Sequence, residues 1–358
     1  MSKFFPLKVA DVIRETADTV AVVLDVPDEW ANDFKYKQGQ YLTFRMLAGG
    51  EEIRRSYSLC SSPFSGEKMC VAVKEVPNGK FSTFINRQLK AGDVLETMHP
   101  AGNFFTELSS SAKKHYAGFA AGSGVTPVMS ILKSVLIHEP HSRFTLVYSN
   151  RNAASVIFYK ELEELKNKYP ERLEIIHVWS RQDTGNKNLN GRLDKNITSY
   201  ILQQFGISGA DEFFICGPEE MIMNVSETLK EKGIAGEKIH FELFTTPVLL
   251  PKGKTAEKKE EGGFSGESEV TVIMDGIKTT FKLSSTGTNV LDAAMDAGSD
   301  APYSCKGAVC CTCKAKILEG KAEMEMNYAL TDKEVADGYI LTCQAHPRSP
   351  KLIVDYDQ

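Results

Sequence analysis

The chain has 358 residues, of which 42% are hydrophobic and 25% are charged, and its formal net charge is −5. This length predicts two or three soluble globular domains, and no apolar run is long enough to cross a bilayer. The first residues lack the apolar core of a signal peptide, so we expect a cytoplasmic protein with reduced thiols. Residues 269–358 carry 13 acidic and 9 basic side chains, a net charge of −4. This negative charge argues against nucleic acid as a partner and suits docking to a basic patch on another protein. The alternative is that the charge only reflects an ordinary solvated surface.

Residues 1–108 have the pattern of a small antiparallel β-barrel. Short β-branched and aromatic segments, bounded by turn residues, recur at 20–25, 40–45 and 69–74. One helix is expected at 82–89, after Asn78 and Gly79, with Ser82 as its N-cap.

Two segments of this barrel have the chemistry to bind a flavin nucleotide. In Arg-Ser-Tyr-Ser at 55–58, the arginine can hold pyrophosphate, the tyrosine can stack on a ring, and Ser58 can donate a hydrogen bond to a ring nitrogen. At 79–82, Gly-Lys-Phe-Ser opens the helix, where backbone N–H groups and a hydroxyl form an anion site. Either segment alone is a common surface feature, but the two together indicate FAD.

Residues 109–246 change to alternating apolar strands and helices, which predicts a doubly wound parallel sheet. Strands are expected at 115–120, 144–149, 173–180, 212–216 and 238–244. Helices are expected at 123–138, 158–168, 199–205 and 219–232. Ligands of such sheets bind at the carboxyl ends of the strands.

The first of these strand ends, Ala-Gly-Ser-Gly-Val-Thr-Pro at 121–127, allows close backbone approach at a helix N-terminus. It is also compatible with an ordinary strand–helix turn. The next two strand ends carry Ser149 with Arg151 and Ser180 with Arg181, and no acidic residue to accept a ribose hydroxyl. Arginine and serine suit a 2′-phosphate, which favours NADPH over NADH, unless these arginines are only solvated charges.

Two further strand ends are expected to reach the same cleft. Cys216-Gly217-Pro218 would face the nicotinamide, although a cysteine beside such a turn is often only a small buried residue. Glu242 ends the last strand, and Phe244 is placed to cover the flavin face that the nicotinamide visits.

A flexible linker is predicted at 247–267, where charged residues of both signs and glycines replace apolar ones. It precedes an α+β domain at 268–358. In that domain a hairpin at 269–283 turns at Asp275-Gly276, and a helix at 290–297 follows.

Four cysteines of this last domain have the spacing of a plant-type [2Fe–2S] cluster, C-x4-C-x2-C followed by a distant cysteine. They are Cys305, Cys310, Cys313 and Cys343, and the intervening Cys311 is expected to be a buried neighbour. Structural zinc or a disulfide is the alternative, but zinc sites usually show two C-x2-C pairs.

Together these motifs resemble the ferredoxin–NADP reductase superfamily, fused to a C-terminal plant-type ferredoxin domain of β-grasp fold. The resemblance implies an FAD-binding barrel, an NAD(P)-binding domain and a hydride-transfer site lined by Ser58, Cys216 and Glu242. The residues it places at the flavin are Arg55, Ser56, Tyr57, Ser58, Val73, Gly79, Lys80, Phe81, Ser82 and Phe244. At the pyridine nucleotide it places Gly122, Ser123, Gly124, Thr126, Ser149, Arg151, Ser180, Arg181, Cys216, Gly217 and Pro218.

The segments 310–313, 326–330, 341–344 and 354–358 are similar to those of phenylacetyl-CoA epoxidase reductases, which supply a di-iron oxygenase in phenylacetate degradation. The resemblance therefore implies electron transfer from NADPH through FAD and [2Fe–2S] to an oxygenase. Reductases of ring-hydroxylating or steroid oxygenases and of desaturases share this domain order. An iron–sulfur redox sensor is the alternative of a different class.

Overall fold

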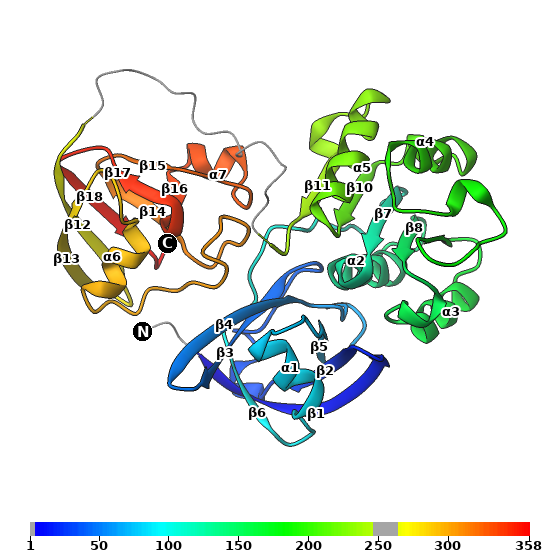
Figure 1. The fold of residues 1–358 in the computed structure, drawn as a ribbon, viewed down its shortest axis with the longest axis horizontal. Coiled ribbons are helices and arrows are strands. Elements are labelled where there is room, and N and C mark those ends of the chain that lie inside the picture. Colours follow the sequence, from blue (N-terminus) through cyan, green and yellow to red (C-terminus); the bar gives the residue numbers. More distant parts are fainter. Residues whose placement is uncertain (1–3, 246–263) are drawn as a thin grey trace.

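The computed structural model describes residues 4–245 and 264–358, which form three main sheets, each with its own hydrophobic core (Figure 1). The predicted linker at 247–267 lies for most of its length outside these described residues. Within the described ranges, no helix is both long and apolar enough to cross a membrane. The domain boundaries proposed at 108 and 246 remain predictions.

The first sheet is antiparallel, with strand order β4-β3-β6-β1-β2-β5. Its strands are β1 (Phe5–Thr16), β2 (Thr19–Asp25), β3 (Tyr41–Ala48), β4 (Glu51–Ser58), β5 (Met69–Lys74) and β6 (Val94–Thr97). Alternate residues of β1, such as Leu7 and Val9, are fully buried, as the two-residue period of a strand requires. Just beyond β4, Leu59 forms an antiparallel bridge with Val71 of β5, which brings the two edges together as a barrel.

The helix of the barrel, α1 (Lys80–Arg87), begins two residues earlier than predicted, and Ser82 is not its N-cap. Asn78 adopts a left-handed conformation, with φ of 61°, so the chain turns sooner and Gly79 becomes the N-cap. The Ser82 hydroxyl instead accepts a hydrogen bond from the backbone N–H of Val76 at 3.1 Å.

The second sheet is parallel, with order β11-β10-β7-β8-β9, as predicted. Its strands are β7 (His115–Ala121), β8 (Arg143–Asn150), β9 (Leu173–Trp179), β10 (Glu212–Cys216) and β11 (Ile239–Glu242). Its helices are α2 (Val125–His138), α3 (Tyr159–Lys168), α4 (Lys195–Gln204) and α5 (Glu219–Glu231). The chain leaves β7 toward β8 on one side and later returns to β10 on the other. This reversal opens a crevice at the carboxyl ends of β7 and β10.

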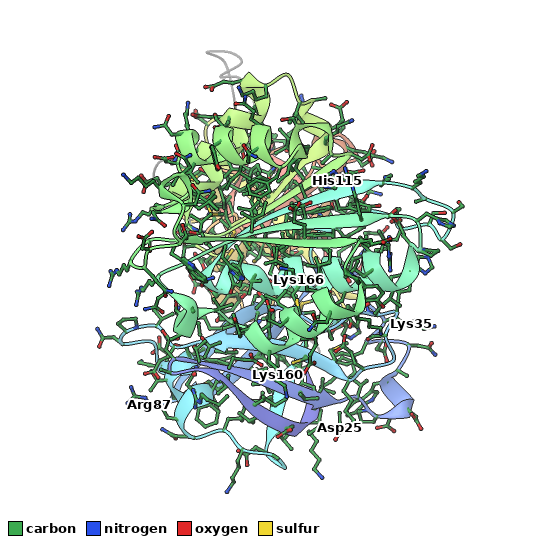
Figure 2. The ribbon with its side chains drawn as sticks, turned by 90° about the vertical axis from the view of Figure 1, so that its right-hand side faces the viewer. Asp25, Lys35, Arg87, His115, Lys160 and Lys166 are labelled. Carbon is green, nitrogen blue, oxygen red and sulfur yellow. The ribbon has the colours of Figure 1, made fainter. Side chains whose placement is uncertain are left out.

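Helices cover both faces of this sheet. One core cluster joins α2 and α3 to the sheet, and another joins α4 and α5 to the opposite face. Figure 2 shows α3, with Lys160 and Lys166, between the parallel sheet and the barrel. At this boundary buried Lys133 of α2 pairs with Glu67 and Glu161 at 3.0 Å each, which fixes the two units against each other.

The third sheet has order β13-β12-β18-β14-β16, and a two-stranded ribbon of β15 and β17 lies beside it. The elements of this domain are β12 (Glu267–Met274), β13 (Ile277–Ser284), α6 (Val290–Asp296), β14 (Lys314–Glu319), β15 (Ala322–Met324), α7 (Asp332–Ala336), β16 (Tyr339–Leu341), β17 (Ala345–Pro347) and β18 (Lys351–Asp355). The predicted hairpin turn at Asp275 and Gly276 is confirmed, with φ of 52° and 72°. The Asp357 carboxylate accepts hydrogen bonds from both backbone N–H groups of that turn.

Candidate functional site

The predicted flavin strand β4 lies at the edge of the barrel with its side chains in different environments. Ser58 is buried, Tyr57 is partly buried against the Phe81 ring at 5.8 Å, and the Arg55 guanidinium is exposed. Burial raises the pKa of Tyr57, so its hydroxyl stays protonated at neutral pH. The strand therefore offers an aromatic ring, a hydroxyl and an exposed guanidinium, which donates to the Arg54 carbonyl at 2.7 Å.

A hollow of about 360 Å³ lies between β3 and the start of α1. It is lined by Met46, Ala48, Asn78, Gly79, Lys80, Thr83, Phe84 and Gln88. The first backbone N–H groups of a helix attract anions. The lining therefore combines donors at the start of α1 with apolar side chains, and the Lys80 ammonium pairs with Glu51 at 3.0 Å. Val73, also predicted at the flavin, has its side chain in the barrel core, and its carbonyl accepts a hydrogen bond from Asn86.

The three residues predicted at the hydride-transfer site come together from two sheets. The Ser58 hydroxyl of the barrel donates to the Glu242 carboxylate at 3.2 Å, and Glu242 is the register partner of Cys216 across β10 and β11. The residue Glu242 keeps some exposure, but its carboxyl group is enclosed by protein. This desolvation raises its pKa to about 8, against the opposing effect of the Ser58 hydrogen bond. Burial also raises the pKa of the Cys216 thiol.

The glycine loop after β7 lies directly against the end of β10. A Cβ on Gly124 would be 2.1 Å from the Cys216 carbonyl oxygen, so only glycine allows this approach. Gly122 has φ of 52°, and the Thr126 hydroxyl donates to the Ser123 carbonyl at 3.0 Å. The crevice of the parallel sheet is thus lined by backbone groups. Phe244, two residues beyond β11, is 44% exposed.

The predicted phosphate residues continue the pairing of β8 and β9 beyond the strand ends. The backbone N–H of Arg181 donates to the Arg151 carbonyl at 2.9 Å, and that of Ser180 donates to the Asn150 carbonyl at 2.9 Å. Arg151 and Arg181 are therefore neighbours, both are exposed, and neither forms an ion pair with a described residue. The two guanidinium groups are available to an anionic ligand.

The four predicted cluster cysteines stand as two pairs of thiols. The Cys305 and Cys310 sulfurs are 3.1 Å apart, and the Cys313 and Cys343 thiols share a hydrogen bond. No three His, Cys, Asp or Glu side chains among the described residues converge as ligands of a single ion. Two pairs of soft thiol donors fit a two-iron cluster, with one pair for each iron.

The loop between these cysteines is tightly folded. Lys306 and Ala308 adopt left-handed conformations, with φ of 50° and 63°, and the Gly307 N–H donates to the Cys305 sulfur at 3.3 Å. Cys311 is directed elsewhere: its thiol donates to the Ala329 carbonyl at 3.5 Å. It is therefore a neighbour of the four thiols and not a member of either pair.

The cysteine loop docks on the barrel beside the flavin strand, an arrangement that sequence reasoning left open. The Ser304 hydroxyl, next to Cys305, is 2.7 Å from the Ser56 hydroxyl of β4. Val309 and Tyr328 of the third domain pack on the core of the parallel-sheet domain. All three domains therefore meet around one point, between Ser58, Glu242 and the cysteine loop.

Sequence reasoning missed two residues at this junction. Buried Arg54 pairs with Asp300 of the third domain, and the Tyr41 hydroxyl contacts the segment between Cys310 and Cys313. The only sequence signal for Arg54 was the doubled arginine before the Ser-Tyr-Ser segment. Nothing in the sequence marks Tyr41.

The geometry defines a three-domain electron-transfer reductase that combines a flavin site, a pyridine-nucleotide crevice and an iron–sulfur domain. Three family models match the chain in this order. They describe an oxidoreductase FAD-binding domain at residues 6–105, an oxidoreductase NAD-binding domain at 119–227 and a 2Fe-2S iron-sulfur cluster binding domain at 272–348.

Relatives and solved structures share the whole arrangement. A component of 1,2-phenylacetyl-CoA epoxidase from Escherichia coli K12 is 39% identical over 100% of this chain and 99% of its own length. The ferredoxin reductase component of 3-ketosteroid-9-alpha-monooxygenase from Rhodococcus rhodochrous is 36% identical, over 98% and 96% of the two chains. A solved structure of phthalate dioxygenase reductase has the same fold, with a TM-score of 0.58 and 23% identity over 98% of both chains. This chain belongs to the family of oxygenase reductase components that use FAD, a pyridine nucleotide and a [2Fe–2S] cluster.

Proposed function

We propose that this reductase takes electrons from NADPH and delivers them to the di-iron component of a phenylacetyl-CoA epoxidase. The full-length identity of 39% to a component of that enzyme supports this acceptor. One observation supports the proposed electron path. The cysteine loop docks on the flavin strand, where the Ser56 and Ser304 hydroxyl oxygens are 2.7 Å apart.

FAD and the cluster convert a two-electron donor into a one-electron donor, and the protein binds and orients them. The net reaction converts one NADPH and two oxidised one-electron acceptors to NADP⁺, one proton and two reduced acceptors. Arg55 and the start of α1 would hold the flavin pyrophosphate, and Tyr57 would flank its ring system. Ser58, Cys216 and Glu242 would line the position where the nicotinamide meets the flavin.

Glu242 and Ser58 can also hold and exchange a proton in this site. Because the pKa of Glu242 is raised to about 8, its carboxyl is largely protonated at neutral pH and can share a proton with Ser58. The two thiol pairs would hold the cluster, with the Gly307 N–H donating to a ligand sulfur. Such N–H donors stabilise the added negative charge of a reduced cluster.

The nucleotide preference rests on Arg151 and Arg181, whose backbones are hydrogen-bonded neighbours and whose side chains are exposed. A 2′-phosphate adds two negative charges where both arginines are exposed and free of described ion pairs. Arginine binds phosphate through paired N–H donors, so NADPH gains contacts that NADH lacks.

A second acceptor has its own support. The reductase component of 3-ketosteroid-9-alpha-monooxygenase is 36% identical over nearly the whole chain, so a steroid oxygenase is the alternative partner.

The test combines the purified, cofactor-loaded protein with the other components of the epoxidase and phenylacetyl-CoA. We expect NADPH consumption coupled to epoxide formation, with little epoxide when NADH replaces NADPH at low concentration. A steroid oxygenase supported at a higher rate would overturn the acceptor. Slow reduction of every acceptor, including cytochrome c, would instead indicate a redox sensor.

A further inference from the structure

The Tyr41 side chain crosses from the barrel into the iron–sulfur domain. Tyr41 is the first residue of β3, and it is only 5% exposed. Its ring lies on Gly102, where φ is 113° and an added Cβ would be 2.9 Å from the Tyr41 Cδ1 atom. Two backbone hydrogen bonds with Ala101, at 2.8 and 3.0 Å, hold Tyr41 in place. The barrel therefore fixes where the phenol group points.

The hydroxyl of Tyr41 contacts the short segment between two cluster ligands. The backbone N–H of Cys311 donates to the Tyr41 oxygen at 3.0 Å, and the Thr312 hydroxyl is 3.2 Å from the same atom. Cys311 and Thr312 are the two residues between Cys310 and Cys313. Tyr41 thus binds the two-residue segment that links Cys310, in one thiol pair, to Cys313, in the other.

The backbone of Tyr41 is paired with the flavin strand β4. In the register of β3 and β4, Tyr41 faces Ser58, and the next residue, Leu42, faces Tyr57. One residue therefore connects the backbone of the flavin site to the backbone of the cluster loop. The Ser56–Ser304 and Arg54–Asp300 contacts also join the two domains, but they reach the loop on the N-terminal side of Cys305. The Asn103 amide of the barrel reaches the Cys311 sulfur at 3.6 Å and the Glu334 carboxylate at 2.9 Å, whereas the Tyr41 hydroxyl accepts from the Cys311 backbone itself.

We propose that Tyr41 is a positioning residue for electron transfer from the flavin to the cluster. Its hydroxyl holds the Cys310–Cys313 segment against the flavin strand and so keeps the two redox groups at a fixed separation. FAD bound at the barrel would supply electrons one at a time to a cluster held by Cys305, Cys310, Cys313 and Cys343, and the one proton of the net reaction would pass to solvent. Tyr41 itself is neither oxidised nor deprotonated. The inference rests on the proposed electron path.

The test uses Tyr41→Phe in the full-length, cofactor-loaded protein, because phenylalanine keeps the ring and removes only the hydroxyl. Tyr36→Phe is the matched control: Tyr36 lies in the same barrel, and its hydroxyl donates to Ser61 at 2.8 Å. Stopped-flow mixing with NADPH separates flavin reduction from the later reduction of the cluster. We expect flavin reduction to be unchanged in both variants and the second phase to slow about tenfold in Tyr41→Phe only, as the Cys311 N–H loses its partner.

A second readout does not depend on turnover. Hydrogen–deuterium exchange of the peptide containing Cys311 and Thr312 should be about tenfold faster in Tyr41→Phe than in the wild type and in Tyr36→Phe. Iron and sulfide content, measured on the same samples, should be unchanged.

Three outcomes would overturn the inference. The first is that the second phase, reduction of the cluster, has the same rate in Tyr41→Phe as in Tyr36→Phe. The second is unchanged exchange at Cys311. The third is a slower flavin reduction in Tyr41→Phe, because the tyrosine would then act on the flavin site itself. If NADPH reduces the flavin but never the cluster of the wild type, the proposed function fails instead, and the exchange experiment still shows whether Tyr41 holds the loop.

Discussion

Arg54 of the flavin barrel forms an ion pair with Asp300 of the iron–sulfur domain, with 3.0 Å between the guanidinium nitrogen and the carboxylate oxygen. The Arg54 side chain is only 2% exposed. It also pairs with Glu52 at 2.6 Å and lies over the Tyr303 ring at 4.4 Å. Separation of the domains would leave Arg54 with Glu52 of its own strand but without Asp300 and the Tyr303 ring, so this buried cation favours the docked arrangement.

Replacing Arg54 with alanine should weaken this docking. Removal of one partner of a buried ion pair typically costs about 3–5 kcal/mol, and Asp300 is partly solvated, so we expect about 2–3 kcal/mol in the free energy of unfolding. Small-angle X-ray scattering should show a larger radius of gyration. Arg87→Ala is the control, since Arg87 of the same barrel is 67% exposed, pairs with Glu75 at 2.7 Å and should cost far less because solvent screens this pair. Equal effects of the two variants would show that Arg54 has no special role in docking.

Replacing Cys313 with serine should abolish electron delivery to cytochrome c while NADPH still bleaches the flavin. Cys313 belongs to one thiol pair, and serine is a poor ligand for iron of this type. Cys311→Ser provides the control, because the Cys311 thiol bonds the Ala329 carbonyl instead. It should keep iron, sulfide and at least half of the cytochrome c activity. Loss of flavin bleaching in a folded Cys313→Ser protein would contradict the proposed order of transfer.

Replacing Arg181 with alanine should weaken the binding of NADPH far more than that of NADH. A hydrogen-bonded ion pair with phosphate contributes about 1.5–3 kcal/mol, so the KM for NADPH should rise about 10- to 100-fold. The KM for NADH should change less than about twofold. Arg192→Ala, which removes an exposed arginine 3.7 Å from Glu220 in the same domain, should change neither. Steady-state kinetics with both nucleotides gives the answer, and an equal loss for both would reject the 2′-phosphate role.

Glu242 should make the stability of the protein depend on pH. Desolvation raises its pKa in the folded state to about 8, above the usual 4.5. The neutral carboxyl therefore stabilises the fold fully below about pH 4.5, and this contribution is lost as the pH rises through about 8. Glutamine cannot ionise, so the stability of Glu242→Gln relative to the wild type should increase by about 1–3 kcal/mol between pH 5 and pH 9.

Denaturant unfolding at several pH values measures this difference. Glu237→Gln, a change of the same kind at an exposed residue near β11, should follow the wild-type curve. Parallel curves for Glu242→Gln and the wild type would show that the Glu242 carboxyl is already ionised in the folded protein at neutral pH.

The local chemistry of this protein could be predicted from its sequence. The spacing of Cys305, Cys310, Cys313 and Cys343 is a chain-local constraint, because a tight loop between ligands needs few residues and small ones. The hairpin turn at Asp275 and Gly276 and the glycine loop beside Gly124 follow for the same reason: they depend on the conformations that their own residues allow. Alternating strands and helices likewise predicted the parallel sheet.

The ends of elements could be predicted less well. Ser82 has the residue type of an N-cap, but the left-handed turn at Asn78 starts α1 earlier and sends its hydroxyl to Val76. Likewise α4 begins at Lys195, before the predicted 199, because the Asp194 carboxylate caps its first turn at Ile197.

Only the tertiary structure decided how the three domains meet. Ser58 and Glu242 are 184 residues apart in the chain, and Tyr41 and Cys311 are 270 apart, yet each pair shares a hydrogen bond. A contact of this kind depends on surfaces that exist only after each domain has folded, so no local pattern of residues records it. The candidate cluster ligands therefore follow from local spacing in the sequence, whereas the side chains that hold one domain against the next do not.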